Sequence, residues 1–451
     1  MLKKLWRKMA GKPAAGSVKH TTPYTGHGLS ADDISFAAEK TVSRLQQAGY
    51  EAYIVGGAVR DLLIGADPKD FDVATNATPE EIRALFRRSR IIGRRFRIVH
   101  VQIGPETIEV TTFRGSGSGG TVQNEQGRIM KDNSYGTLAE DAGRRDFTCN
   151  ALYFDPVKRE IHDFHNGVED VRQRRIVMIG NPAERYREDP VRILRAVRLA
   201  GKLGFTVEEH TAAPAAQYAG RLKEEPPARL FDEITKLLFS GHARRCLDQF
   251  RALGIDTRIH PLLDSLQQAA AGGRSGIVAE SLKNTDERVR AGKSVSAGFV
   301  LAALMWDKLD TLWQKHRQHG LKPAHALIQA MSELDGTMEK GWGVPQKFTA
   351  TMREIWILQP QFDNRRGMRP HRLLAQPRFR AAYDFLVLRA QTGSAEQELA
   401  DWWTTFQHAP PEEREKMTAS VPAAADAPAD SRRKRRRKPR KRKSADADAV
   451  G

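Results

Sequence analysis

The segment Lys69–Val73 carries two carboxylates, Asp70 and Asp72, at alternate positions. In a strand, alternate side chains share a face, so the two carboxylates would point together while Phe71 and Val73 enter a core. Neighbouring carboxylates repel unless a cation lies between them, and Mg²⁺ typically takes one or two carboxylates plus substrate phosphates. By itself, such a pair is more often the polar face of an edge strand than a metal site.

Two further features favour a site for phosphate and metal. Gly56 and Gly57 stand between an expected strand and an expected helix, where the backbone can approach a phosphate and the helix offers free N–H groups. Arg60, one turn later, could reach the same anion, although a plain strand-to-helix turn would look alike. Glu109 lies in the apolar strand 108–113; if that strand lies beside the paired aspartates, three carboxylates converge, which suits two metal ions in phosphoryl transfer.

Other chemistries find little support in the sequence. There is no G-x-x-x-x-G-K-[ST] loop and no nucleophile-elbow motif, which argues against a P-loop NTPase and an α/β-hydrolase. His162 and His165 have the spacing of metal ligands but no cysteine ligands nearby, so zinc is not expected. Cys149 and Cys246 are expected to be small buried residues rather than nucleophiles.

Charge is the strongest compositional signal. The chain has 451 residues and a formal net charge of +18. Eleven of the twelve residues 432–443 are basic, among them Arg432, Arg433 and Lys434, and residues 1–12 add five more basic residues. The body between these ends is therefore close to neutral. Such a run is solvated and disordered because like charges repel, and it favours a polyanion partner, of which nucleic acid is the first candidate.

Composition also bears on the compartment. No stretch of about 18 apolar residues is present, so no membrane-spanning helix is expected. The basic amino terminus is not followed by the apolar region of a secretory signal. A short apolar stripe of Leu2, Leu5, Trp6 and Met9 would allow weak contact with an anionic membrane surface. Two cysteines cannot form a disulfide framework, which favours the reducing cytoplasm.

Hydrophobic periodicity predicts an amino-terminal part that mixes strands and helices, then a long helical part, then a charged end. A polar loop is expected from residue 114 to about 143, and an Ala/Pro linker at 421–430. The expected helices cover 31–48, 58–64, 79–87, 191–203, 228–239, 299–313, 352–357, 378–389 and 396–406, and the expected strands cover 53–55, 71–73, 98–103 and 108–113.

Several motifs in fixed order resemble a known family. They are Gly56-Gly57-x-x-Arg60-Asp61, Asp70-Phe71-Asp72, Arg144-Arg145-Asp146-Phe147-Thr148 with Asn150, and Glu188-Asp189-x-x-Arg192-x-x-Arg195. In order and spacing they are similar to the class II branch of the nucleotidyltransferase superfamily, which contains CCA-adding tRNA enzymes and bacterial poly(A) polymerases. The resemblance covers about residues 50–245, and the remainder resembles the helical body and arginine-rich end of the polymerases.

The resemblance implies roles for individual residues. Asp70 and Asp72 would coordinate Mg²⁺, and Asp146 would complete the catalytic carboxylates, a role for which Glu109 competes. Gly56, Gly57 and Arg60 would contact the triphosphate of ATP. Asp189, Arg192 and Arg195 would recognise adenine and its sugar, because a carboxylate accepts from an amino group and a guanidinium donates to ring acceptors. Arg145 and Asn150 are included among the expected nucleotide-binding residues.

One segment separates the two sister activities. Residues 91–101 are similar to the signature that marks the polymerases, whereas CCA-adding enzymes usually differ there. Arg94, Arg95 and Arg97 surround Phe96 before a strand, and such a cluster could hold RNA backbone or nucleotide phosphates. A basic surface turn is the alternative explanation.

Two motifs also have structural explanations. Asp189 followed by Pro190 is typical of a helix start, so Asp189 could cap a helix as well as bind substrate. The segment 226–238 resembles the neck of the family, where RNA is held, but its leucines and isoleucine form a helical core face, so we interpret it first as structural.

The sequence thus predicts an α+β fold: a small mixed sheet with helices, then a mainly helical neck and body, then a disordered basic tail. The expected parts are a flexible basic segment 1–28, a catalytic head 29–180, a neck 181–245, a body 246–420 and a tail 421–451. The expected activity is template-independent addition of AMP from ATP to RNA 3′ ends with release of pyrophosphate. The alternatives are a CCA-adding enzyme and an inactive RNA-binding protein on the same fold. RNA-decay proteins are possible partners.

Overall fold

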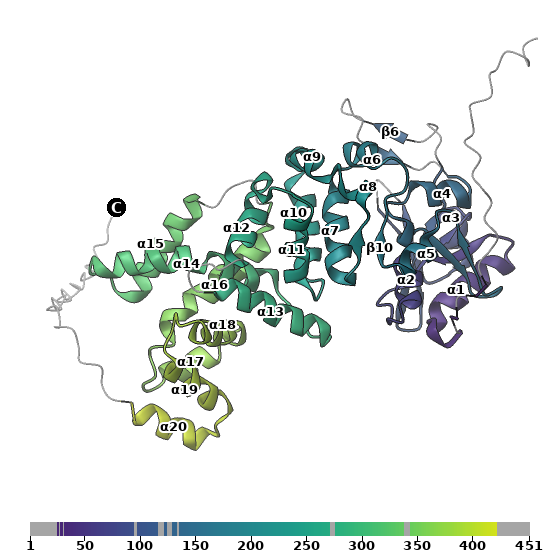
Figure 1. Cartoon of the computed structure of the whole chain (residues 1–451). Coiled ribbons are helices and arrows are strands. Elements are labelled where there is room, and N and C mark those ends of the chain that lie inside the picture. Colours follow the sequence, from purple (N-terminus) through teal and green to yellow (C-terminus); the bar gives the residue numbers. More distant parts are fainter. Residues whose placement is uncertain are drawn as a thin grey trace, which may run out of the picture.

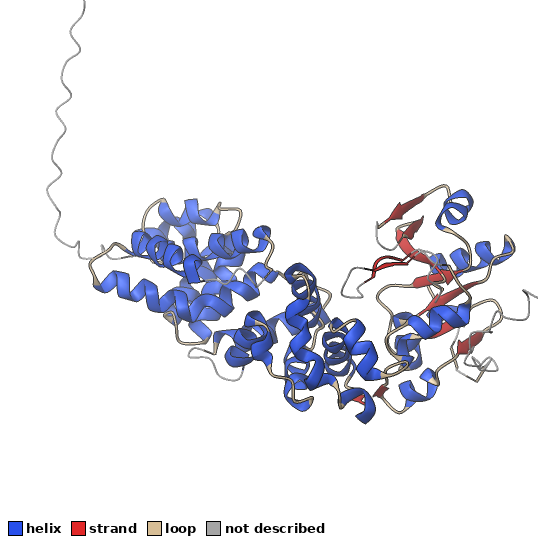
Figure 2. Ribbon diagram, turned by 90° about the horizontal axis from the view of Figure 1, so that it is seen from above, coloured by secondary structure: helices blue, strands red, loops and turns tan. Residues whose placement is uncertain are grey.

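The computed structural model describes residues 25–421 except 27, 30, 94–96, 116–120, 124–128, 133–134, 271–275 and 338–342. Figure 1 shows the sheet-containing head at one end of an elongated chain, a stack of helices in the middle, and the last helices, α17 (Arg369–Leu374) to α20 (Pro411–Ala419), at the far end. The same division is visible from above, where the strands gather at one end (Figure 2). The α+β prediction is therefore confirmed, while the basic run 432–443 lies outside the described residues.

The head is built on a seven-stranded mixed sheet in the order β3-β4-β5-β2-β1-β8-β9. Strand β1 pairs antiparallel with β2 and β8, and β2 pairs parallel with β5. Its strands are β1 (Ala52–Val55), β2 (Asp72–Thr75), β3 (Ser89–Ile92), β4 (Ile98–Ile103), β5 (Glu106–Thr112), β8 (Leu152–Asp155) and β9 (Glu160–Asp163).

The two faces of this sheet have different surroundings because side chains alternate along each strand. Ile54, Val73 and Val110 enter the main hydrophobic core, which includes α1 (Phe36–Gln47). The other face carries a smaller apolar cluster around Tyr53 and Tyr153, against α4 (Leu138–Arg144). The polar residues of the candidate site belong to this second face, beside the part that α4 covers.

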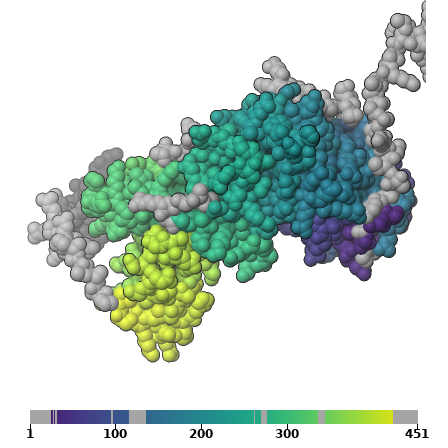
Figure 3. Space-filling view, in the orientation of Figure 1, coloured from purple at the N-terminus to yellow at the C-terminus, as the bar shows by residue number. Residues whose placement is uncertain are grey.

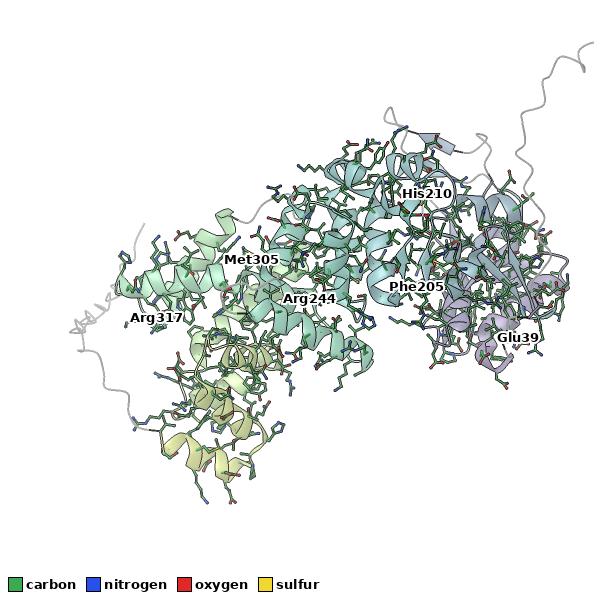
Figure 4. The ribbon with its side chains drawn as sticks, in the orientation of Figure 1. Glu39, Phe205, His210, Arg244, Met305 and Arg317 are labelled. Carbon is green, nitrogen blue, oxygen red and sulfur yellow. The ribbon has the colours of Figure 1, made fainter. Side chains whose placement is uncertain are left out.

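Short helices connect the strands of the head. Helix α2 (Gly57–Leu63) follows β1, and α3 (Pro79–Leu85) follows β2 with a capping box between Thr78 and Glu81. Helix α5 (Gly167–Arg172) follows β9. A two-stranded parallel sheet, β10 (Arg175–Ile176) with β11 (Thr206–Val207), joins the end of the head to the neck. Phe205, labelled in Figure 4, is buried at this junction.

The neck and body are helical, and the main core continues through them without interruption. A second core lies among the helices near the carboxyl end, around Phe362 and Trp403. Figure 3 shows these last helices projecting from the mass formed by head, neck and body. The longer helices are α6 (Pro182–Glu188), α7 (Val191–Leu203), α10 (Pro227–Leu238), α11 (Ala243–Ala252), α12 (Pro261–Ala270), α13 (Ile277–Arg290), α14 (Ala297–Gln318), α15 (Pro323–Thr337), α16 (Gln346–Leu358), α18 (Phe379–Gln391), α19 (Gln397–His408) and α20 (Pro411–Ala419).

The predicted polar loop from 114 to about 143 is wrong in part. It contains the hairpin strands β6 (Thr121–Gln123) and β7 (Ile129–Asp132), as well as α4. Helix α4 begins at a capping box between Thr137 and Glu140, a local signal within an otherwise polar stretch. The first helix is also shorter than predicted, because Ser35 caps it and only a 3₁₀ turn, Ala31–Asp33, precedes it.

Among the described residues, no helix combines the length and the apolar character needed to cross a membrane. The basic amino-terminal segment with its apolar stripe lies outside the described residues.

Candidate active site

The paired carboxylates lie at the start of β2. The strand begins at Asp72, and Asp70 is the exposed residue two positions before it. Phe71 and Val73 both pack into the main core, so the predicted alternation of faces is confirmed. Asp70 and Asp72 therefore stand at the solvent side of the sheet.

Glu109 lies next to Asp72, as the sequence predicted for adjacent strands. In the parallel pairing of β2 with β5, Asp72 is directly opposite Glu109. Side chains directly opposite in a sheet share a face and are neighbours. In the next pairing, of β5 with β4, Glu109 is opposite His100, and His100 Nε2 lies 3.1 Å from Glu109 Oε1.

The pKa of Asp72 reflects this arrangement. Its pKa is raised from 3.8 to about 6, first by burial, then by the negative charge of Glu109, with a smaller contribution from Asp70. Arg145 acts in the opposite direction. Although Asp72 is exposed by surface area, protein atoms on the flanking strands β1 and β5 still restrict its hydration. Carboxylates that repel in this way are stabilised by a cation between them.

The carboxylates at this point of the sheet are ligands that suit Mg²⁺, but they do not form a complete metal site by themselves. In the described part of the chain, no three His, Cys, Asp or Glu side chains are grouped closely enough to hold a metal ion. Mg²⁺ is usually bound by one or two carboxylates, with water and substrate phosphates completing the coordination. Asp70, Asp72 and Glu109 supply carboxylate oxygens of the kind that such a site needs.

The two glycines of the first motif make the turn between β1 and α2. Gly56 has φ 76° and ψ −124°, a conformation that favours glycine, and its N–H donates to the carbonyl of Leu152. A Cβ at Gly56 would come within 3.4 Å of Arg145 Nη1, and one at Gly57 within 3.5 Å of Arg60 Nη2. The turn thus brings backbone close to two guanidinium groups.

Asp146 belongs to a buried polar network. Arg60 is buried, and its Nη1 donates to Asn150 Oδ1 over 2.6 Å. Asn150 donates to Asp146 Oδ1, and Arg195 Nη2 lies 2.7 Å from Asp146 Oδ2. Arg195 and these hydrogen bonds outweigh burial and lower the pKa of Asp146. The network joins α2, the turn after α4, and α7.

Arg145 forms a compact group beneath the site. Its Nε donates to Tyr153 Oη over 2.8 Å, and its Nη2 donates to Asp141 Oδ2 over 3.1 Å. Tyr153 in turn donates to the same oxygen of Asp141 over 2.5 Å. Although burial opposes it, the neighbouring Tyr153 and Asp141 raise the pKa of Arg145, which remains a fixed positive charge near Asp72.

Asp189 makes the expected contact with the start of a helix and, in addition, an ion pair that was not predicted. Its Oδ1 accepts from the N–H of Val191 over 3.3 Å, so it caps the start of α7, with Pro190 at the N-cap position rather than inside the helix. Its Oδ2 accepts from Arg229 Nη2 over 2.8 Å, and Arg229 also contacts Glu225. Both acidic partners raise the pKa of Arg229 against the effect of burial.

The remaining predicted residues are placed as follows. Arg192 Nη1 donates to Glu188 Oε2 over 2.8 Å on the same side of α7 as Arg195. Arg97 is described and donates to Glu80 Oε1 over 2.5 Å. The other RNA-binding candidates, Arg94, Arg95, Arg432, Arg433 and Lys434, lie outside the described residues.

Four residues of the site were not predicted from the sequence. Asp141 and Arg229 are the acid and base that hold Arg145 and Asp189, and His100 contacts Glu109. Arg185 donates to the carbonyls of Arg144 and Arg145. Arg229 lies in the neck-like segment and His100 in the segment 91–101, so both had a usable signal, whereas no motif singled out Asp141 or Arg185.

The prediction that both cysteines are buried is confirmed. Cys149 and Cys246 are both free and buried. Burial raises the pKa of the Cys149 thiol to about 12, so it is not a reactive thiolate. Burial lowers the pKa of His162 and His165. Neither belongs to a metal-binding group within the described residues.

Comparisons with family models match most of the chain. Residues 52–177 match the poly A polymerase head domain, and residues 319–442 match the polymerase A arginine-rich C-terminus. Residues 204–267 match a model described as the probable RNA and SrmB-binding site of polymerase A. Together they follow the order of head, neck and body.

Comparisons with individual proteins point the same way. The chain is 43% identical over 403 residues to Poly(A) polymerase I of Salmonella typhi, covering 87% of each chain. It is 39% identical to Poly(A) polymerase I of Haemophilus influenzae, covering 86% of this chain and 88% of that one. A CCA-adding enzyme of Lactobacillus helveticus is 37% identical, but over 50% of this chain and 55% of that one.

A solved structure supports the fold. The CCA-adding enzyme of Bacillus stearothermophilus in complex with CTP aligns with a TM-score of 0.54 and 27% identity, covering 85% of this chain and 80% of that one. The mixed sheet with its carboxylates and the following helices therefore define a nucleotidyltransferase of the class II type. Within that class, the chain belongs to the bacterial poly(A) polymerase family.

Proposed function

We propose that this nucleotidyltransferase adds AMP from ATP to RNA 3′ ends without a template and releases pyrophosphate. The observation that carries this conclusion is the 43% identity to Poly(A) polymerase I over 87% of both chains. The sequence similarity to the CCA-adding enzyme of Lactobacillus helveticus covers only 50% of this chain, whereas that to Poly(A) polymerase I covers 87%. This favours the polymerase over the sister activity.

Asp70 and Asp72 are proposed to hold Mg²⁺, with Glu109 as the third carboxylate of the site. Bound Mg²⁺ would supply the positive charge that lowers the pKa of the primer 3′-hydroxyl and holds the triphosphate of ATP. Glu109 is favoured over Asp146 for the third carboxylate because it is the residue paired with Asp72 across the sheet. Asp146 Oδ1 accepts from Asn150 and from the N–H of Phe147, and Asp146 Oδ2 forms an ion pair with Arg195 without a hydrogen bond.

Asp146 is proposed instead to position the arginines around the nucleotide. Through Asn150 it holds Arg60 beside the Gly56 turn, and through its other oxygen it holds Arg195 on α7. Arg145 is fixed on the other side of the same turn. Backbone N–H groups and guanidinium groups in this arrangement suit the oxygens of a triphosphate.

Asp189, Arg192 and Arg195 are proposed to read the incoming base. All three stand at the start or along the first turns of α7, and Asp189 is fixed by Arg229. A carboxylate accepts from the amino group of adenine, and a guanidinium donates to ring nitrogens. A pocket built this way discriminates because a base with the wrong pattern leaves a buried polar group unpaired.

The primer assay tests the activity and its alternatives. A single-stranded RNA primer is incubated with Mg²⁺ and each nucleoside triphosphate in turn. Long tails from ATP alone are expected; incorporation of CTP followed by arrest would favour CCA addition, and no incorporation would leave an RNA-binding protein. Asp70→Ala should abolish extension while RNA binding persists, and near-normal extension by this variant would remove the metal role of Asp70.

RNA binding is proposed along one side of the neck, in a basic strip formed by Lys69, Lys202, Arg245 and Arg290. Burial is the largest cause of the lowered pKa of His242. The charges of Arg245, Arg290 and Lys202 lower that pKa further, which indicates that the three cations lie near one residue. Arg60, Arg198 and Lys69 act on Lys202 in the same direction, while Asp61 opposes them. The strip begins beside Asp70 and continues along α7 to the ends of α11 and α13.

Charge reversal tests this strip. The double variant Lys202→Glu, Arg245→Glu should bind single-stranded RNA more weakly. The dependence of its log affinity on log salt should be shallower by about 1 to 2. Arg317→Glu, on the distant part of α14 labelled in Figure 4, is the matched control and should leave the slope unchanged. An equal slope in all three proteins would exclude the strip as the RNA path.

The segment 204–267 is proposed to contact RNA and a protein partner, in keeping with the description of the family model that it matches. The cytoplasm is proposed as the place of reaction because both cysteines are free. Copurification with RNA-decay proteins from a cytoplasmic fraction, and its loss on replacement of exposed residues of α11 such as Arg244 (Figure 4), would test both statements.

A further inference from the structure

A row of polar side chains crosses the solvent face of the sheet through the candidate site. Strand pairing places Arg90 opposite His100, His100 opposite Glu109, and Glu109 opposite Asp72. The order of charge from the sheet edge inward is a cation, an imidazole and two carboxylates. His100 therefore separates the carboxylates from the edge strand and is the neighbour of Glu109 on the side away from Asp72.

The contact between His100 and Glu109 has a defined geometry. His100 Nε2 lies 3.1 Å from Glu109 Oε1. An ionised carboxylate only accepts hydrogen bonds, so the proton of this bond is on Nε2. The contact engages Oε1, and Glu109 as a residue stands directly opposite Asp72 on the neighbouring strand. A long glutamate side chain without such a contact would be free to rotate away, since half of its surface is exposed.

We propose that His100 is a positioning residue that holds Glu109 beside Asp72 in the orientation that a metal ion requires. Groups that hydrogen-bond a metal ligand fix its orientation, and their loss typically costs 10–100-fold in metal affinity or activity. This inference rests on the proposed function, because it assumes that Glu109 is a ligand. It assigns a physical role to a residue of the segment 91–101, the part of the chain that resembles the polymerase signature.

The chain contains a matched control for this contact. His316 Nε2 lies 3.1 Å from Glu333 Oε2, between α14 and α15 in the helical body. The pair has the same chemistry and the same length as the pair in the head. Surface ion pairs of this kind contribute little to stability. Loss of either pair should therefore leave the fold intact, and only the pair beside Asp72 should affect the metal.

The experiment compares His100→Ala, His100→Gln and His316→Ala with the wild type. The first readout is the binding of Mn²⁺ in the absence of nucleotide and RNA. Electron paramagnetic resonance detects the bound Mn²⁺. The dissociation constant for Mn²⁺ should rise 10–100-fold in His100→Ala. It should return to within a few fold of wild type in His100→Gln, whose amide still donates, and should not change in His316→Ala.

The second readout is the steady-state rate of AMP addition. Because His100 is inferred to act through Glu109 and not on the nucleotide, kcat should fall in His100→Ala while KM for ATP stays within about twofold. The inference is overturned if His100→Ala binds Mn²⁺ like the wild type, or if His100→Gln is as impaired as His100→Ala. A change in melting temperature equal in His100→Ala and His316→Ala would indicate only a general surface effect.

Failure of the inference and failure of the proposed function give different results. If the wild type extends RNA and Asp72→Asn does not, the proposed function stands whatever His100 does. If Asp72→Asn and His100→Ala both bind Mn²⁺ normally, the carboxylates are not the metal site, and the metal role of Asp72 and the positioning role of His100 both fall. Normal binding in His100→Ala alone removes only the role of His100.

Discussion

Replacing Asp72 by asparagine is expected to stabilise the protein while abolishing its activity. In the folded wild type, Asp72 lies near Glu109 and Asp70. Its pKa of about 6 in place of 3.8 corresponds to a free-energy penalty for ionising Asp72 in the folded state. A shift of about two pKa units corresponds to about 3 kcal/mol at most. Because Asp72 is exposed to solvent, screening reduces this, and we expect about 1 kcal/mol for Asp72→Asn.

The effect should depend on pH in a specified direction. Below about pH 4, Asp72 is protonated in both the folded and the unfolded chain, so wild type and variant should be equally stable. Between pH 4 and 6 the unfolded chain ionises first, and the folded wild type binds more protons than the unfolded chain. Its stability therefore falls with rising pH relative to Asp72→Asn, and the difference is complete above pH 6.

Urea unfolding at several pH values between 4 and 8, without added metal, measures this difference. Asp67→Asn, an exposed aspartate on the same loop, is the control and should show no gain at pH 8. Addition of Mg²⁺ should stabilise the wild type more than Asp72→Asn. The reasoning is refuted if Asp72→Asn is less stable than wild type at pH 8, or if its gain is the same at pH 4 and pH 8.

Three further outcomes are expected. Gly201→Ala would place a Cβ 2.5 Å from a backbone atom of α11 and should destabilise the protein by about 2 kcal/mol. The control Gly143→Ala in α4 meets open space and should be neutral or slightly stabilising. Urea unfolding measures the stability of both variants. Arg229→Ala removes the partner of Asp189, so kcat/KM with ATP relative to CTP should fall about tenfold, and an unchanged ratio would contradict the role of this contact. Deletion of 432–443 should weaken RNA binding and flatten its salt dependence between 50 and 200 mM; the same slope as wild type would show that the run serves another purpose.

Local features of the fold could be read from the sequence because they depend on neighbours along the chain. The helix 191–203 and the strand 98–103 follow hydrophobic periodicity and agree with α7 and β4. The alternation of Phe71 and Val73 with the aspartates predicted which face would be polar. Helix α4 was missed because a short capped helix in a polar stretch has no clear periodicity.

The candidate site was predictable as a set of residues but not as an arrangement. Glu109 and Asp146 were equal candidates for the third carboxylate. We favour Glu109 because β5 pairs in parallel with β2, although two other strands, β3 and β4, lie between them in sequence. No local pattern specifies that pairing, since it depends on which strands share a sheet.

The sequence by itself determined the class of chemistry, because several separate motifs stand in an order and spacing that resemble the class II nucleotidyltransferases, whereas each motif alone has common structural explanations. Only the tertiary structure decided which groups act on them. Arg229 holds Asp189 from forty positions away, and Arg60 reaches Asn150 across ninety. Such contacts arise when helices and strands pack, so the electrostatics of the site depend on the fold and not on the spacing of its motifs.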